Sequence, residues 1–247
     1  MKTPNGTGHE QNVTNLELLL TIFPTFGEAY NPPRPALTIP ALTDLLQKGK
    51  LEINAVNAAG VVFQNAGAAR AVEFDDFDKL ITRTINSLRI TGVSSQTLAQ
   101  AEAIVRDLRG KRASGLLSEE ELAAEKAKGN NITQVKVHKS TIDSKIENLA
   151  KYVLFLAAVP DYKPNEAELK VEGLQAKLDA IKAKNTDAKT AEAALEAARI
   201  SRNALMNTDN TGLVDTANDA KLYVKSAFGA TSPQYKQISS IAFIKIK

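Results

Sequence analysis

Hydrophobic positions recur at alternating steps of three and four residues along two long stretches of the chain. In the first stretch these positions are Ile39, Leu42, Leu46, Gly49, Ile53, Val56, Gly60, Phe63, Gly67, Arg70 and Phe74. In the second stretch they are Val171, Leu174, Leu178, Ile181, Asn185, Ala188, Glu192, Leu195, Arg199, Arg202 and Met206. This spacing is typical of the seam of a long helix packed against another helix. We therefore predict two long helices of about 36 residues each.

The two stretches align with each other without gaps. Residues 37–74 match residues 169–206, which lie 132 positions later. Before each long helix, matching positions hold Tyr30 and Tyr162, and Pro32 and Pro164. After a short insertion, residues 92–100 match residues 229–237, including a shared Gly-x-(Ser/Thr)-Ser sequence. Because chance rarely keeps both the hydrophobic phase and this helix-start signal, we predict an internal duplication.

Small residues occur on both predicted seams. Gly49, Gly60 and Gly67 each cost the first helix about 1 kcal/mol relative to alanine. They either break this helix or admit a neighbouring backbone, and the sequence leaves both alternatives open. In the second helix, the alanine-rich stretch from Ala188 to Ala198 favours close approach of a partner helix.

Shorter amphipathic segments surround the two long helices. We predict further helices at about 12–23, 75–92, 94–110, 118–129, 141–158 and 211–228. Ser118 and Glu121 form a capping-box pattern at the start of the fourth of these helices. A proline-punctuated segment at 24–40 is expected to be extended, and the tail to be a short strand or an extended arm docked on the bundle.

These elements predict an all-α fold. It would be an elongated helical bundle built from two duplicated long-helix halves, with extended N- and C-terminal arms. The predicted segments are 1–36 (N-terminal helix and arm), 37–113 (first repeat), 114–137 (charged connector), 138–237 (second repeat) and 238–247 (C-terminal tail).

Composition excludes several classes of function. The 247 residues include 31 Lys and Arg against 28 Asp and Glu, so the net charge of +3 argues against a polyanion-binding tail. The absence of cysteine excludes disulfides and thiolate chemistry. The first apolar run, at 16–23, is too short for a membrane span and lacks the features of a signal peptide. A cytoplasmic location is therefore the default expectation, and non-classical export stays open.

No catalytic, cofactor-binding or metal-binding motif stands out. His138 lies near Asp143, but we interpret it as an exposed or capping residue rather than a general base. Acidic residues at 75–78 and 119–121 fit the first turns of helices, where they complement the helix dipole without a metal ion. The basic clusters, Arg106/Arg109/Lys111/Arg112 and Lys136/Lys139, lack interleaved aromatic residues and are interpreted as solvated helix faces. We expect no small-molecule substrate.

Three arginines on the seams are the only candidate site residues. Arg70 and Arg202 occupy matching positions in the two copies, and Arg199 lies one turn before Arg202. Long cationic side chains at such positions either pair with a carboxylate or form an anion site. The candidate partners are Glu73, Asp76 and Asp215.

A resemblance to a known family rests on several segments. They are Tyr162–Val171, Ala198–Asn203, Gly212–Asp215, Tyr223–Gln237, Thr82–Asn86 and Gly110–Ala113. With them, most of residues 30–243 resembles an uncharacterised family of helical proteins from bacteroidete bacteria. The resemblance implies a helical fold and brings no activity or site residue.

These observations favour a non-enzymatic structural or scaffold protein. We expect it to self-associate as a homo-oligomer through helical faces and terminal arms. The alternative is a helical module that binds nucleic acid or another polyanion through its lysines and arginines; the balanced charge makes nucleic acid the weaker expectation of the two.

Overall fold

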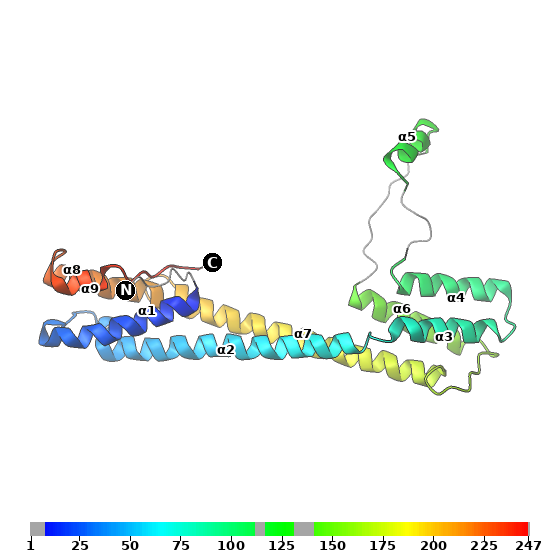
Figure 1. Cartoon of the computed structure of the whole chain (residues 1–247), viewed down its shortest axis with the longest axis horizontal. Coiled ribbons are helices and arrows are strands. Elements are labelled where there is room, and N and C mark those ends of the chain that lie inside the picture. Colours follow the sequence, from blue (N-terminus) through cyan, green and yellow to red (C-terminus); the bar gives the residue numbers. More distant parts are fainter. Residues whose placement is uncertain (1–7, 112–116, 131–140, 247) are drawn as a thin grey trace. The chain divides into compact units, whose positions relative to one another are not determined.

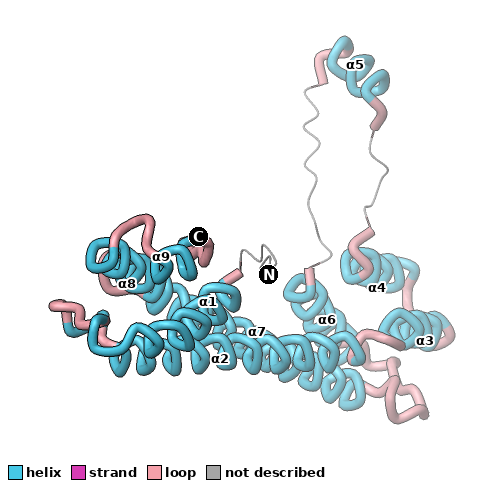
Figure 2. The backbone as a smooth tube through the Cα atoms, turned by 60° about the vertical axis from the view of Figure 1, so that its left-hand side comes forward, coloured by secondary structure: helices cyan, strands magenta, loops and turns pink. Residues whose placement is uncertain are grey.

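The computed structural model describes residues 8–111, 117–130 and 141–246. All regular elements within these ranges are helices, and none is a strand. Figure 2 shows the described chain as helices joined by loops and turns. The all-α prediction is therefore confirmed.

Nine α-helices follow one another along the described chain (Figure 1). They are α1 (His9–Ile22), α2 (Ile39–Val72), α3 (Phe77–Arg89), α4 (Ser95–Leu108), α5 (Glu119–Ala127), α6 (Ile142–Ala157), α7 (Val171–Asn207), α8 (Leu213–Phe228) and α9 (Pro233–Ser239). The predicted long helices correspond to α2 and α7, and α2 runs without interruption through Gly49, Gly60 and Gly67. The segment expected to be extended contains two 3-10 turns instead, Phe23–Ala29 and Pro35–Leu37. A proline in the first turn starts each of them, because proline lacks the N–H that would be unpaired there.

Side-chain caps explain where several helices begin. The hydroxyl oxygens of Ser94, Thr141 and Ser232 accept hydrogen bonds from backbone N–H groups three residues later, at 3.1–3.2 Å. Ser118 and Glu121 form the predicted capping box, with bonds of 3.2 and 2.7 Å. These caps satisfy N–H groups that a helix leaves unpaired in its first turn. The capped helix α5 lies in the predicted charged connector, most of whose remainder falls outside the described residues.

The chain divides into two compact units. Unit 1 comprises Met1–Asn65 and Thr190–Lys247, and unit 2 comprises Ala66–Lys189. The units differ from the predicted segments 37–113 and 138–237, because each long helix contributes one part to unit 1 and the other to unit 2.

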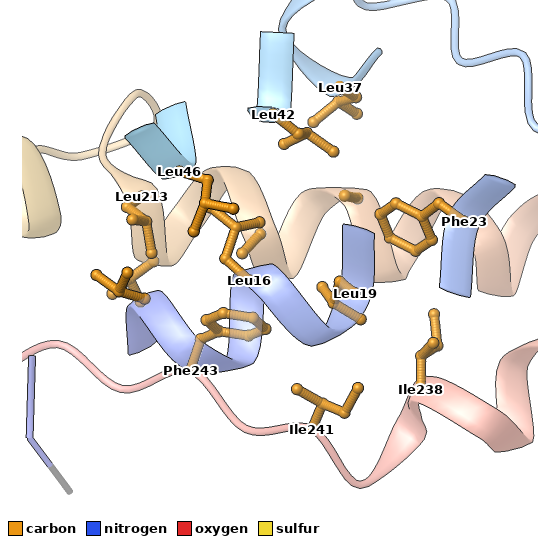
Figure 3. Close-up of a cluster of buried hydrophobic side chains, with 14 of the residues drawn as sticks. Leu16, Leu19, Phe23, Leu37, Leu42, Leu46, Leu213, Ile238, Ile241 and Phe243 are labelled. Atoms are coloured by element: carbon orange, nitrogen blue, oxygen red, sulfur yellow. The ribbon is translucent and has the colours of Figure 1, made fainter. Parts of the chain in front are cut away.

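The core of unit 1 is formed by α1, the two 3-10 turns, the first half of α2, the end of α7, α8, α9 and the C-terminal tail. Figure 3 shows Leu16 and Leu19 of α1 among side chains from the other elements. Gly49 allows this close packing, because a Cβ there would lie 3.1 Å from a methyl carbon of Leu213 and 3.2 Å from one of Val13. The glycine therefore admits neighbouring side chains rather than a neighbouring backbone.

The C-terminal tail is an extended arm docked on unit 1. Of the two predicted alternatives, a short strand and a docked arm, the structure thus has the second. Asn12 of α1 donates to the carbonyl of Ile244 at 2.9 Å and accepts from its N–H at 3.2 Å. Asn15 donates to the carbonyl of Ala242 at 2.7 Å, and Phe243 is buried in the core. The arm begins later than predicted, since α9 continues to Ser239.

The core of unit 2 is formed by α3, α4, α6 and the first half of α7. Its largest fully buried side chain is Tyr152 of α6, whose hydroxyl donates to Thr84 of α3 at 3.2 Å. Burial raises the pKa of Tyr152 to about 12. The other fully buried members of this core include Ile81, Leu88, Leu108, Leu156, Leu174 and Ile181.

The predicted seam matches the buried stripe of α2, and it matches that of α7 with two exceptions. Glu192 and Arg199 are exposed, while the preceding residues Ala191 and Ala198 face inwards. Burying an unpaired charge is costly, whereas alanine packs closely against a neighbouring helix. The placement of Arg199 on the seam was therefore wrong.

Two buried tyrosines make the same hydrogen bond in the two units. The hydroxyl of Tyr30 donates to the carbonyl of Leu37 at 2.7 Å, and that of Tyr162 donates to the carbonyl of Leu169 at 2.7 Å. Each bond closes the loop that leads into a long helix. Burial raises the pKa of both hydroxyls.

We expect Tyr162→Phe to lower the free energy of unfolding by about 1–2 kcal/mol, because it leaves a buried carbonyl without a donor. Tyr30→Phe should cost a similar amount. Tyr235→Phe is the control, since this hydroxyl makes no hydrogen bond with the described residues. Urea denaturation of the three variants measures the effect, and equal stability of all three would contradict the structural role of these bonds.

Candidate functional site

An open groove of about 540 Å³ lies between α2 and α7 in unit 1. The apolar part of its lining includes Val56, Val61, Phe63 and Leu195, and Gly60 lies among them. A Cβ at Gly60 would meet nothing within 4 Å, so this position leaves room above the helix backbone.

The groove is open because the other elements of unit 1 cover neighbouring parts of the long helices. Asn57, which lines the groove, donates to Glu10 of α1 at 3.4 Å, and α1 begins one residue before Glu10. Within the described part of the chain, the groove beyond that point is lined by residues of α2 and α7. Val61 and Val62 are each 57% exposed, and Ile200 on α7 is also exposed.

Charges of both signs border the groove. Arg199 forms an ion pair with Glu196 one turn earlier on α7, and Glu192 lies beside them in the lining. Arg199 is thus an exposed groove residue with a partner on its own helix. It was not predicted to pair with Glu196.

Arg70 belongs to a polar network in unit 2. It donates to the side-chain oxygen of Asn185 at 3.1 Å, and Asn185 donates to a carboxylate oxygen of Asp143 at 2.9 Å. Lys189 bonds the same oxygen at 2.8 Å. The bonds from Lys189 and Asn185 lower the pKa of Asp143.

The acidic partners predicted for Arg70 bind other cations. Glu73 pairs with Lys177 at 2.6 Å, and Asp76 pairs with Lys79 at 3.0 Å. Asn185 links Arg70 to Asp143 instead, because the amide offers both an acceptor and a donor.

Arg202 lies at a pocket of about 230 Å³ in unit 1. The lining consists of Gly8, His9, Glu10, Ile53, Val56, Asn57 and Arg202. Arg202 donates to the side-chain oxygen of Asn203 through Nε at 3.2 Å and through Nη2 at 2.9 Å. Its predicted partner, Asp215, instead accepts from Lys245 at 2.8 Å and from the backbone of Asn210 at 2.8 Å.

His9, which lines this pocket, has an unsatisfied polar atom. Its Nδ1 is buried and has no hydrogen-bond partner among the described residues. Burial lowers the pKa of His9, and the nearby charge of Arg202 lowers it further. The pKa of Arg202 itself is lowered mainly by burial and further by the nearby charge of Arg199.

The described part of the chain contains no cluster of three or more His, Cys, Asp or Glu side chains that could hold a metal ion. It also contains no helix long and apolar enough to cross a membrane. His138 and the basic residues Arg112, Lys136 and Lys139 lie outside the described residues. Of the remaining basic residues, Arg109 donates to the hydroxyl of Thr82 at 2.6 Å.

Sequence reasoning missed two important side chains. Asn185 was recognised as a seam residue, but its bridging role follows from the proximity of Arg70 and Asp143, which are distant in sequence. The proximity of His9 to Arg202 could not be predicted either, because the two residues are distant in sequence.

Comparison with known proteins identifies no relative: no protein-family model, curated protein or solved structure matches this chain. The resemblance to a bacteroidete family therefore stays a prediction. The geometry of the groove, the polar network and the Arg202 pocket is the basis for functional inference.

Proposed function

We propose that the protein is a non-enzymatic scaffold that self-associates through the groove between α2 and α7 in unit 1. The observation that carries this proposal is a groove whose described lining comes from α2 and α7 and includes the exposed apolar side chain of Val61. Apolar side chains gathered around a groove are typical of an interaction surface. The occupant we propose is the same surface of a second copy.

A second copy fits this surface for reasons of geometry and charge. In the groove region, α2 and α7 each cover only one face of the other helix. The same two helices of a second copy could cover the remaining faces and complete a four-helix bundle. Twofold symmetry is the commonest symmetry of homo-oligomers, and it would place this groove against the same groove of the second copy. The acidic Glu192 of one copy could then pair with the basic Arg199 of the other copy across the axis. The docked C-terminal arm already contacts its own chain, so we assign the association to the helical face.

An internal duplication is part of the proposal, and three features support it. The long helices begin at Ile39 and Val171, which are 132 residues apart. The tyrosine hydrogen bonds to Leu37 and Leu169 have the same offset and the same length. The order of elements also repeats, with one helix before and two helices after each long helix in the series α1–α4 and α6–α9.

We expect Val61→Lys to weaken self-association at least about tenfold, equivalent to about 1.4 kcal/mol, because it places a charge in a desolvated contact. Val61 is largely exposed, so the variant should fold normally. The matched control is Leu222→Lys on α8 of the same unit, which removes an apolar side chain of similar exposure (61%) outside the groove. Sedimentation velocity over a range of concentrations measures both variants.

Two results would count against this proposal. One is a wild-type protein that sediments as a monomer at every concentration. The other is an equal loss of association in Val61→Lys and Leu222→Lys, which would place the contact elsewhere.

The alternative, a polyanion-binding module, has less support. Basic side chains of unit 2 form ion pairs, among them Arg83 with Glu168 at 2.8 Å and Arg89 with Glu102 at 2.7 Å. Cations that are already paired contribute little to phosphate binding, which depends on the release of counterions from the polyanion.

A further inference from the structure

The pocket around Arg202 and His9 holds an arginine that forms no ion pair with the described residues. Its hydrogen bonds to described residues both go to a neutral amide, that of Asn203. Arg199, the nearby cation, has its own partner in Glu196. The one carboxylate in the pocket lining is Glu10, which is exposed and accepts a long hydrogen bond of 3.4 Å from Asn57.

From these contacts we infer that the pocket lined by His9, Asn57 and Arg202 binds a small oxyanion, such as a carboxylate or a phosphate group. A guanidinium presents several N–H groups in a planar fork that matches two oxygens of such a ligand. His9 also lines the pocket, and its protonated imidazole can donate a hydrogen bond to an oxyanion. The side-chain amide of Asn57 supplies a further donor in the lining.

The matching corner of unit 2 already holds an oxyanion. There, Arg70 takes the place of Arg202, Lys189 that of Asn57, and Asn185 that of Ile53, each with the 132-residue offset. Asn185 and Lys189 donate to the carboxylate of Asp143, and Arg70 donates to Asn185. The position that matches Asp143 is Gln11, whose amide bonds Asn15 at 2.8 Å.

Unit 1 thus keeps the arginine of this corner and has an uncharged Gln11 at the position that matches Asp143. A ligand from outside would take the place that Asp143 fills in unit 2. This comparison rests on the proposed duplication, whereas the unpaired charge of Arg202 and the unpartnered atom of His9 do not.

The charged groups around His9 define what a titration should show. Arg202 approaches from α7 and lowers the pKa of His9, Glu10 lies next to it on α1, and α2 contributes the uncharged Ile53, Val56 and Asn57. A bound anion would counter the charge of Arg202 and stabilise the imidazolium. It should therefore raise the pKa of His9 by about one unit.

Proton NMR of the full chain can test this directly, because the sequence contains only two histidines. His138→Gln leaves His9 as the single imidazole signal. The titration is followed from about pH 5 to 8 with sodium sulfate, which stays fully charged, and with sodium chloride at the same ionic strength. Acetate, as a carboxylate probe, is titrated in parallel, so that a response to one probe or to both identifies the preferred oxyanion.

We expect sulfate, acetate or both to raise the pKa of His9 above its value in chloride. Arg202→Gln should abolish this rise, and Arg89→Gln, which removes an exposed arginine of unit 2, should preserve it. Circular dichroism checks that both variants are folded. If Arg202→Gln does not fold, Arg202→Lys replaces it and should retain only part of the rise, because lysine keeps the charge without the planar fork.

Either of two outcomes would overturn the inference: the same pKa for His9 in chloride and in both oxyanions, or an unchanged rise in a folded Arg202→Gln variant. The readout does not depend on self-association. Sedimentation of the same samples therefore separates a failure of the anion site from a failure of the scaffold proposal.

Discussion

Replacing Leu174 by alanine is expected to lower the free energy of unfolding by about 2–5 kcal/mol. Leu174 is fully buried in the core of unit 2, near the start of α7. Its truncation removes apolar contacts and leaves a cavity that the surrounding helices can fill only in part. Urea denaturation followed by circular dichroism measures the loss.

A matched variant shows which of the two units loses stability. Leu42 lies 132 residues earlier, is also fully buried and belongs to the core of unit 1. Hydrogen exchange should accelerate mainly in unit 1 for Leu42→Ala and mainly in unit 2 for Leu174→Ala, because each core is made of residues from its own unit. Identical exchange patterns in the two variants would show that the whole chain opens as one cooperative body instead.

Replacing Gly173 by alanine is the second change with a large expected effect. A Cβ at this position would lie 2.2 Å from the carbonyl oxygen of Ala167 and 2.9 Å from the Cα of Glu168. Both are backbone atoms, so relief requires a shift of the turn that leads into α7. We expect a loss of about 1–3 kcal/mol in the free energy of unfolding.

Gly67→Ala provides the control for this prediction. Gly67 lies inside α2, and a Cβ there would meet nothing within 4 Å. Alanine should therefore stabilise the helix, by up to about 1 kcal/mol. Thermal unfolding of the two variants should shift the midpoint in opposite directions, and a stabilising effect of Gly173→Ala would contradict the close approach seen in the structure.

The candidate sites could be predicted from the sequence only in part. The seam pattern placed Arg70 and Arg202 on inward faces, and both are half-buried. It could not identify their neighbours, because Asn185 and His9 reach the two arginines through folding and not through sequence proximity. Arg199 was misplaced because the pattern does not weigh the cost of burying a charge against the ease of burying the adjacent alanine.

Local chemistry was enough to determine most of the helices. The period of the apolar residues specified α2 and α7, and the hydroxyl side chains at helix starts specified α4, α5 and α6, since capping and amphipathicity act within a few residues. The extended tail was left open between a strand and a docked arm. Its pairing with Asn12 and Asn15 of α1 joins residues more than 220 positions apart, so only the tertiary structure could decide it.

The division into two units was likewise decided in three dimensions. The repeat predicted from the sequence is consecutive, whereas unit 1 combines most of α2, up to Asn65, with the second half of α7. A long amphipathic helix has the same apolar stripe along its whole length. The stripe therefore does not predict which other helices pack against each part of it. The covering segments are chosen by the packing of all the helices together, and the same packing leaves the groove between α2 and α7 open.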